Sequence, residues 1–572
     1  MLYRKNKERA LSPELFKNPT AEYRSTPFWA WNSGLDHAEL ARQIDAFAEM
    51  GFGGFHMHVR QGLEAAYLGD EFLDAVRFCT EYAKSKNMLA WLYDEDRWPS
   101  GVAGGMVTKN KQHRQKFLTM SVTDRENCAN DPLEAARTGK PYFVAAFDVP
   151  VDSEGVMHSY RHVGRDEPAE NKRYFFLEQK QGGEPRYNYQ SYVDALSKDA
   201  IDEFIATTHE SFKRAVGDEF GKTVPAIFTD EPQLSGFVAL KSGFDKSDAF
   251  CSFTTDFAET YRLEFGEELT DKLPELFFAT DMPTAPATRY NYFSHLTERF
   301  NRAYIDNIAD WCEEAGISLT GHLLGEDTLY EGALNNGDVM RSYKKMQMPG
   351  IDILCDDVVY KTPIQCRSAV RQYGREAMLS ELYGVTGWDF DFRGHKYQGD
   401  WQAALGVNVR VPHLAWQSMK GEGKRDYPAP ISYQSAWHKE YKYLEDHYAR
   451  INTAMTRGTA EVNIGVIHPI DSYNILFATV AESKAAREEL ERKDAELCEW
   501  LLSGAYDFDY ISESLLPDLC TESGAPLAVG KMKYDVVIVA NCTTLRPHTI
   551  KMLDGFKRSG GRLIFLGPRT CS

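Results

Sequence analysis

The feature of this sequence that most constrains its fold is a repeated alternation of short apolar runs with amphipathic helical segments. Eight apolar runs precede residue 420 and lie at 27–32, 51–60, 88–96, 225–231, 317–327, 350–357, 376–384 and 406–418. The helix expected to open at Asp36, with Glu39 in the capping-box position, carries an apolar stripe from Leu40 to Ala48 and ends at Gly51. Eight parallel strands joined by helices close a barrel. The sequence therefore predicts a (β/α)8 TIM barrel over residues 1–455.

Two stretches depart from this rhythm and predict further structural units. Residues from about 107 to 195 alternate at period two without a helical signal, which predicts an inserted antiparallel β subdomain after the third strand. From 456 the rhythm restarts, with apolar runs at 461–469, 506–511, 533–542 and 561–567 and a long charged helix at 481–503. This pattern predicts a separate flavodoxin-like α/β domain over residues 456–572.

Composition restricts the partners that we expect. The net charge of -19 argues against nucleic acid and anionic membranes, because phosphate binding needs clustered Lys and Arg. No segment has the apolar length of a signal peptide core or a membrane span, so we expect a cytoplasmic protein. The ten cysteines lack CxxC spacing, which favours reduced and mostly buried thiols without a functional role.

Two carboxylates at strand ends indicate a catalytic function. Glu231 ends the fourth run and Glu381 the seventh, and the carboxyl ends of barrel strands share one rim. Two carboxylates facing each other across a cleft perform glycoside hydrolysis, and their mutual repulsion together with burial separates their pKa values. If Ile227 and Thr229 face the lumen, strand alternation places Glu231 there too and turns Asp230 toward the helices. Glu231 is then the candidate acid, and Asp230 orients the loop.

The other strand ends carry polar and aromatic side chains of the kinds that recognise sugar hydroxyls and sugar faces. For any single one of them, a packing role explains the residue equally well. The candidate substrate-binding residues are Trp31, Asn32, His56, His58, Arg60, Asp94, Glu95, Trp98, Asp230, His322, Glu326, Tyr383, Trp388 and Trp416.

The pair His56 and His58 raises the alternative of a metal-dependent hydrolase, because H-x-H on a strand puts both rings on one face. The other strand ends lack the further nitrogen ligands that such chemistry uses, so we do not expect a transition metal. Oxygen ligands such as Asp94, Glu95 or Asp96 are compatible with calcium. The sequence assigns no metal position.

Five stretches carry a resemblance to a known family: "PFWAWNSGL", "GFGGFHMHVRQGL", "WLYDEDRWPSGVAGG", "FGKTVPAIFTDEP" and "LTGHLLGED". Together they resemble the barrel of glycoside hydrolase family 106 over roughly residues 25 to 420. The resemblance implies α-L-rhamnosidase activity, with Glu231 in "TDEP" as general acid and Glu381 in "SELYG" as the base that activates water. It also implies a calcium ion near the bound sugar.

The same barrel resembles the clan whose two glutamates lie on strands four and seven, where the second glutamate is a nucleophile. In many members an Asn precedes the acid, whereas Asp230 stands there in this sequence, which favours inversion. The family usually continues into C-terminal β-sandwich domains that help to build the sugar pocket, so the identity of the sugar depends less on this resemblance than the barrel does. The region after residue 460 resembles the α/β domain of trimeric β-galactosidases, which implies a homo-oligomer.

These observations predict an exo-acting glycosidase that removes a terminal neutral or deoxy sugar, α-L-rhamnose first, from a small oligosaccharide or glycoside. The chemistry requires no cofactor. A retaining enzyme acting on β-linked galactosides or mannosides is the main alternative. A metal-dependent barrel hydrolase and a non-catalytic sugar-binding protein stay open as well.

Overall fold

The computed structural model describes residues 2–8, 10–421 and 431–567. Its largest sheet has nine strands in the order β14-β13-β12-β11-β8-β3-β2-β1-β15, and every pair in it is parallel. The strands are β1 (Phe28–Trp31), β2 (Gly54–Val59), β3 (Leu89–Tyr93), β8 (Ala226–Asp230), β11 (Ser318–His322), β12 (Met348–Ile353), β13 (Leu379–Leu382), β14 (Val409–Pro412) and β15 (Ala415–Trp416).

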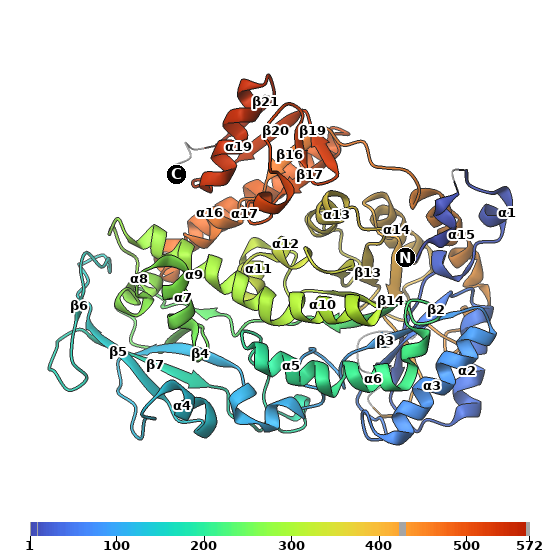
Figure 1. The fold of residues 1–572 in the computed structure, drawn as a ribbon, viewed down its shortest axis with the longest axis horizontal. Coiled ribbons are helices and arrows are strands. Elements are labelled where there is room, and N and C mark those ends of the chain that lie inside the picture. Colours follow the sequence, from blue (N-terminus) through green and yellow to red (C-terminus); the bar gives the residue numbers. More distant parts are fainter. Residues whose placement is uncertain (1, 9, 422–430, 568–572) are drawn as a thin grey trace.

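The last predicted strand, 406–418, consists of two short strands that close the sheet. β14 pairs with β13 at Leu379 and Val409, and β15 pairs with β1 at Trp29 and Ala415. Because β14 and β15 follow each other directly along the chain, the two ends of the sheet meet and a barrel forms (Figure 1). The predicted (β/α)8 barrel is confirmed.

The barrel strands are buried on both faces. Phe28 of β1 contacts Phe228 of β8 with ring centroids 4.9 Å apart, although these strands are not neighbours in the sheet. The contact therefore crosses the interior, and it marks one side of each strand as the lumen side. Trp29 and Trp31 alternate with Phe28 and pack against the outer helices in the large apolar cluster.

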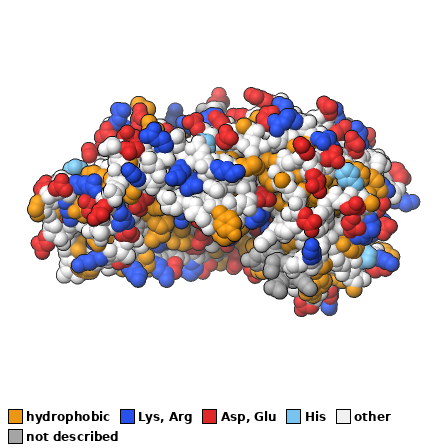
Figure 2. Space-filling model, turned by 90° about the horizontal axis from the view of Figure 1, so that it is seen from below, with side chains coloured by type: hydrophobic (Ala, Val, Ile, Leu, Met, Phe, Trp, Pro, Cys, Tyr) orange, Lys and Arg blue, Asp and Glu red, His pale blue; other side chains and the backbone are white. Residues whose placement is uncertain are grey.

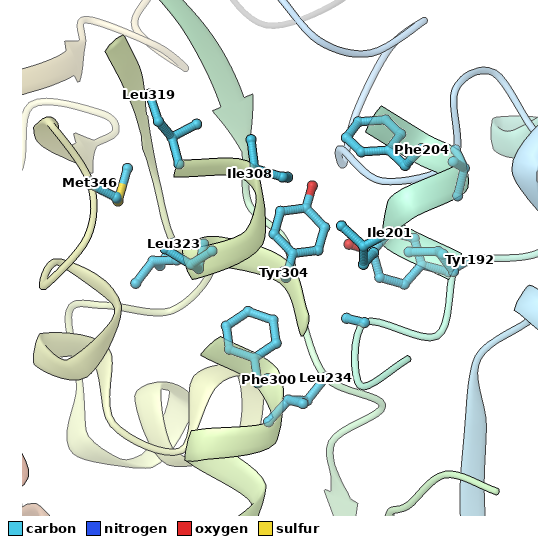
Figure 3. Packing of buried hydrophobic residues seen from close by; sticks show 14 of the residues in the cluster. Tyr192, Ile201, Phe204, Leu234, Phe300, Tyr304, Ile308, Leu319, Leu323 and Met346 are labelled. Atoms are coloured by element: carbon cyan, nitrogen blue, oxygen red, sulfur yellow. The ribbon is translucent and has the colours of Figure 1, made fainter. Parts of the chain in front are cut away.

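Helices cover the outside of the barrel (Figure 1). The principal ones are α2 (His37–Glu49), α3 (Asp70–Ser85), α5 (Lys198–Thr207), α6 (His209–Val216), α9 (Ala285–Phe300), α10 (Asp306–Ala315), α11 (Leu329–Asn336), α13 (Lys361–Tyr373), α14 (Phe392–Ala404) and α15 (Lys442–Met455). Figure 3 shows Tyr304 and Ile308 packed between Phe204 of α5 and Leu319 of β11. Asp36 caps α2 through the backbone N–H of Glu39, as the capping box predicts. None of the described helices is long and apolar enough to span a membrane.

An antiparallel sheet lies beside the barrel, at the lower left of Figure 1. Its order is β6-β5-β7-β4-β10-β9, with β4 (Lys116–Ser121), β5 (Tyr142–Asp148), β6 (Arg161–His162), β7 (Lys172–Gln179), β9 (Phe237–Val238) and β10 (Ala249–Ser252). The first four strands lie within the predicted insertion, whereas β9 and β10 come from the segment after β8. A short helix, α4 (Pro132–Thr138), interrupts the region in which no helix was expected.

The C-terminal region forms a four-stranded parallel sheet in the order β17-β16-β20-β21, at the top of Figure 1. The strands are β16 (Ile464–Ile467), β17 (Phe508–Ile511), β20 (Val536–Ala540) and β21 (Arg562–Leu566), with α17 (Val480–Ser503) and α19 (Pro547–Arg558) among its helices. The sheet is joined to the barrel by α13, whose Arg371 Nη1 lies 2.9 Å from the buried Asp509 Oδ1. Gln372 Nε2 of the same helix donates to the carbonyl oxygen of Tyr510 at 2.8 Å.

Basic and acidic side chains are interspersed on the face of the molecule shown in Figure 2.

Candidate active site

Four adjacent strands bring acidic side chains and one histidine to the carboxyl end of the barrel. Asp230 ends β8, His322 ends β11, and these two are register partners. Asp352 of β12 and Glu381 of β13 are register partners as well. The side chains of Asp230, His322 and Glu381, and those of Glu231, His322 and Asp352, offer atoms within 4.8 Å of one another at the barrel mouth.

The structure corrects the predicted orientation of Asp230. Thr229 Oγ1 lies 3.1 Å from the hydroxyl of Tyr304 in the helical layer, and Ile227 packs in the outer cluster. Phe228 and Asp230 consequently face the lumen, where the hydroxyl of Tyr93 donates to Asp230 Oδ2. The prediction that Ile227 and Thr229 face the lumen is therefore wrong, and Asp230 is a residue of the mouth and not of the helical layer.

Glu231 reaches the same mouth because the chain leaves the strand at this residue. Its φ of 46° lies in the left-handed region, which a residue with a Cβ rarely adopts. Its backbone N–H donates to the carbonyl of His322 at 3.3 Å, and the indole Nε1 of Trp98 donates to its Oε2. The strained turn thus presents Asp230 and Glu231 to one site.

His322 lies between the two predicted catalytic glutamates. Its Nε2 is 3.1 Å from Asp230 Oδ1 and 3.9 Å from Glu231 Oε1, while its Nδ1 is 3.7 Å from Glu381 Oε2. Glu231 and Glu381, which are 150 positions apart in the sequence, therefore approach opposite nitrogens of one imidazole ring.

The electrostatics of the mouth follow from this crowding. Burial alone would lower the pKa of His322, but the hydrogen bond and charge of Asp230 and the charges of Asp352 and Glu381 raise the pKa well above its ordinary value. Burial raises the pKa of Glu231 to about 8, with Asp230 and Asp352 adding to the effect and His322 and Trp98 opposing it. The ring of His322 is therefore charged and Glu231 is protonated at neutral pH.

Glu381, Asp352 and Glu326 also hold protons more tightly than usual. Burial, and then the charge of Asp352, raise the pKa of Glu381 well above its ordinary value. Burial raises the pKa of Asp352 and of Glu326 to about 7. Glu326 is fixed by the hydroxyl of Tyr343 and the backbone N–H of Asp352, both at 2.7 Å. Carboxylates placed this close resist ionising together, so the cluster shares protons.

A second pair of residues lies next to the other carboxylate oxygen of Glu381. His413, which follows β14, places Nε2 3.7 Å from Glu381 Oε1. Arg60, which follows β2, places Nη2 3.1 Å from the same nitrogen of His413. Burial, and then the charge of Arg60, lower the pKa of His413 well below its ordinary value, so this ring is neutral and can accept from the guanidinium.

The loop after β3 carries Trp98, and the carboxylate of Glu95 holds this loop in shape. Glu95 accepts hydrogen bonds from the backbone N–H groups of Asp96, Gly101, Val102, Ala103 and Gly104. Ser100 joins the loop to β8, because its backbone N–H donates to the carbonyl of Asp230 and its Oγ accepts from the N–H of Asp230, both at 2.8 Å. This loop carries the indole that holds Glu231.

Several predicted sugar contacts have packing roles instead. Trp31 lies in the outer apolar cluster, and Asn32 links β1 to the segment after β15 through both the carbonyl and the N–H of Ser418. Asp94 faces His209 of α6 and accepts from Ser100 Oγ. Glu95 is occupied by its own loop, as described above.

Two of the predicted aromatic contacts, Tyr383 and Trp416, also differ from expectation. Tyr383 is buried and donates to the carbonyl of His395 in the helical layer. Trp416 is buried in the apolar filling of the lumen. Trp388 is 58% exposed and lines a small cavity of about 110 Å³ with Trp437, so its role as a sugar contact stays a prediction.

His56 and His58 lie deep in the lumen, among Phe28, Trp91 and Tyr93. Burial lowers the pKa of His56 to about 3, and burial also lowers the pKa of His58 well below its ordinary value. Both rings are neutral parts of the barrel filling. Their predicted role as sugar contacts is wrong, because the aromatic rings enclose them.

The acidic mouth brings possible metal ligands close together. Among the described residues, two groups place three candidate ligand atoms within 4.8 Å: Asp230, His322 and Glu381, and Glu231, His322 and Asp352. Both groups include His322, whose ring can bind a metal ion only through an unprotonated nitrogen. The H-x-H pair belongs to neither group.

Sequence reasoning missed Asp352 as a member of the site. Its only signal is a carboxylate inside the apolar run "GIDIL", where an unpaired charge is costly. Asp356 and Asp357, which follow the same apolar run a few residues later, are the more obvious acids at this strand end.

Comparison with known proteins agrees with the barrel. No protein family model matches the chain. A curated protein of Formosa agariphila named "putative beta-glucuronidase" is 21% identical over 395 residues, which cover 67% of this chain. The chain spans only 30% of the length of that protein.

Solved structures of glycosidases share the fold. A rhamnosidase from Novosphingobium sp. PP1Y superposes with a TM-score of 0.67 at 13% identity, covering 98% of this chain and 70% of that one. A β-galactosidase from Bacillus circulans sp. alkalophilus gives a TM-score of 0.59 at 12% identity, with coverages of 96% and 72%. At these identities the similarity establishes the architecture.

Proposed function

We propose that this chain is a glycoside hydrolase in which Glu231 is the general acid and Glu381 the general base. The observation that carries the proposal is the convergence of both glutamates on His322 at the barrel mouth. Glycoside hydrolysis needs one carboxyl that is protonated and one that is ionised. The raised pKa of Glu231, about 8, keeps the proton that the leaving oxygen must receive.

Glu381 takes the role of base from the family resemblance. Burial and the charge of Asp352 raise its pKa, and the charge of His322 opposes this rise. In its ionised form this carboxylate faces the charged ring of His322 on one side and the neutral ring of His413 on the other. It accepts a proton from water as the oxygen of that water bonds to the anomeric carbon. Glu231 gives its proton to the glycosidic oxygen as the bond to the leaving group breaks. Proton transfer between the carboxyls and solvent then restores the starting state.

For the sugar, we propose an exo-acting enzyme that removes terminal α-L-rhamnose with inversion. The Novosphingobium rhamnosidase that superposes over 98% of this chain supports this choice, as does the resemblance of the barrel motifs to family 106. Asp230, in place of the Asn that precedes the acid in retaining relatives, supports inversion.

Replacing each glutamate tests the mechanism. Glu231→Gln and Glu381→Gln should each lower kcat by several orders of magnitude on aryl glycosides while leaving the thermal transition in place. Glu331→Gln, on the exposed surface of α11, is the matched control and should retain wild-type turnover. Near-wild-type rates in both active-site variants would refute the assignment.

A retaining β-galactosidase is the second candidate. The β-galactosidase from Bacillus circulans supports it through a TM-score of 0.59 over 96% of this chain. Following the first-formed anomer by NMR on a panel of aryl glycosides separates the two candidates, because retention gives the anomer of the substrate and inversion the opposite one.

Three further expectations have direct tests. The proposed chemistry needs no cofactor, and dialysis against EDTA followed by addition of Ca²⁺ tests the calcium that the family resemblance implies. Light scattering tests the homo-oligomer, and cell fractionation tests the cytoplasmic location. Sugar binding without turnover on any glycoside would favour a non-catalytic protein.

A further inference from the structure

A small polar cavity adjoins the proposed catalytic residues. It has a volume of about 210 Å³ and lies between the loop after β2 and the loop after β3. Its lining consists of Arg60, Gly62, Leu63, Ala65, Tyr67, Asp96, Arg97 and Asn188.

Each wall of the cavity is connected to one of the two glutamates. On one side, Arg60 contacts His413, and the same nitrogen of His413 lies 3.7 Å from Glu381. On the other side, Arg97 directly precedes Trp98, whose indole donates to Glu231. A group bound in this cavity would therefore lie beside residues that are linked to both carboxyls.

The charges of the cavity favour an anion. Two guanidinium groups, Arg60 and Arg97, and one carboxylate, Asp96, line the cavity. Asp96 accepts a hydrogen bond from Asn188 Nδ2 at 2.9 Å and lies 3.6 Å from Arg97. Arg97 is held in place, because its Nη2 donates to Asn188 Oδ1 at 2.8 Å and its Nη1 to the carbonyl of Pro185 at 3.3 Å. Guanidinium groups bind carboxylates and tetrahedral oxyanions through paired N–H donors.

Tyr67 lines the cavity, and its hydroxyl is buried behind the cavity surface. This hydroxyl has no hydrogen-bond partner among the described residues. Burial, and then the charges of Glu95 and Asp94, raise the pKa of Tyr67 well above its ordinary value, so the phenol keeps its proton. A buried hydroxyl of this kind is stabilised by an acceptor on a ligand.

We propose that this cavity binds an anionic substituent, a carboxylate or a sulfate ester, on a sugar of the substrate next to the bond that is cleaved. The proposal rests on the glycosidase function above and adds a substrate class, an acidic saccharide. The rest of the mouth is rich in carboxyls and disfavours an anion, so the arginine-lined cavity is where an acidic substrate can be accommodated.

Calorimetric titration of the whole chain tests the proposal through binding. D-glucuronate, D-galacturonate and glucose 6-sulfate are compared with glucose and galactose. We expect at least one anionic sugar to bind about tenfold more tightly than its neutral counterpart. Arg97→Gln should reduce this preference to about threefold or less. Arg393→Gln, at a side chain that is 93% exposed, is the matched control and should keep it.

The outcomes separate the two proposals. Equal binding of acidic and neutral sugars, no binding of any of them, or an undiminished preference in Arg97→Gln would overturn the anionic site, even in an enzyme that hydrolyses neutral glycosides. Tight binding of an acid without turnover of any glycoside would support the site and contradict the glycosidase function. If Arg97→Gln fails to fold, Tyr67→Phe replaces it, with an expected loss of preference of a few-fold and an unchanged preference as the contrary result. The relative affinities of glucuronate and glucose 6-sulfate identify the substituent.

Discussion

The hydrogen bond from Trp98 to Glu231 makes a prediction about the pH dependence of catalysis. Trp98→Phe removes the indole N–H that donates to Glu231 Oε2 and retains an aromatic ring beneath Arg186, which stacks 4.6 Å from the indole centroid. The bond favours the ionised form of the carboxyl and opposes the effect of burial on its pKa. Removing the bond should therefore raise the pKa of Glu231.

The magnitude follows from the strength of such a bond. A hydrogen bond to a charged group contributes about 1.5–3 kcal/mol, and one pKa unit corresponds to about 1.4 kcal/mol. Trp98 is only partly buried, so water replaces part of the lost interaction. We therefore expect the lower end of this range, an increase of about one pH unit above the wild-type value of about 8.

The assay is the pH profile of kcat/KM on an aryl glycoside, which reports the ionisations of the free enzyme. If Glu231 must be protonated, activity falls on the alkaline side as it ionises, and Trp98→Phe should move that limb upward by about one pH unit. Trp500→Phe, at an exposed position of α17, should leave the profile unchanged. An alkaline limb that stays in place or moves downward in Trp98→Phe would show that the indole does not hold the titrating acid.

Three further predictions concern the supports of the site. Asp352 has its pKa raised from 3.8 to about 7, so the folded chain keeps a proton that the unfolded chain releases across that window. The free energy of unfolding therefore falls as the pH rises from about 4 to about 7. Asp352→Asn should narrow the difference in Tm between pH 5 and pH 8, by an amount that corresponds to roughly 1–3 kcal/mol. A difference in Tm equal to that of the wild type would contradict this. Ser100→Ala leaves the buried Asp94 without its hydroxyl donor and should cost about 1–3 kcal/mol in urea unfolding. Trp388→Ala should raise KM roughly two- to tenfold with kcat unchanged if the exposed ring stacks on sugar, and an unaltered KM would argue against that contact.

The barrel could be predicted because its signal is repeated many times along the chain. Each apolar run and each amphipathic helix, such as α3 with Phe72, Val76 and Cys79 buried on one face, repeats the same local pattern. The division of the last run into β14 and β15 has no such signal. It arises because the chain must pair with β13 on one side and β1 on the other to close the sheet, and this is a property of the whole barrel.

The facing of individual strand residues could not be predicted for a related reason. A strand in a parallel barrel is buried on both sides, so its apolar residues do not reveal which side is the lumen. In β8 all five residues are buried, and the pattern "AIFTD" is compatible with either phase. The error at Asp230 follows from this ambiguity. Glu231 escaped it only because its left-handed backbone takes it out of the strand alternation.

The same ambiguity explains why several predicted sugar contacts are structural. Asp94 and Glu95 stand at the end of the β3 run in the same way that Asp230 and Glu231 stand at the end of the β8 run. In both places an apolar run is followed by an Asp and a Glu. Only the fold shows that Glu95 is enclosed by five backbone N–H groups of its own loop, whereas Glu231 has its chief donor in a neighbouring loop. A carboxylate at a strand end is thus a candidate for catalysis, and its hydrogen-bond partners decide the role.

The chemistry of the mouth follows from the closure of the barrel. Parallel strands that end at one level bring Asp230, Asp352 and Glu381 around His322, and the left-handed turn adds Glu231. Four carboxyls around one imidazolium cannot all be ionised, so the proton that glycoside cleavage requires is retained by the packing itself. The loop anchored by Glu95 carries Trp98, and the hydrogen bond from Trp98 then influences how firmly Glu231 holds its proton. In this arrangement the acid strength of Glu231 depends on burial, on the neighbouring charges and on the loop that carries Trp98.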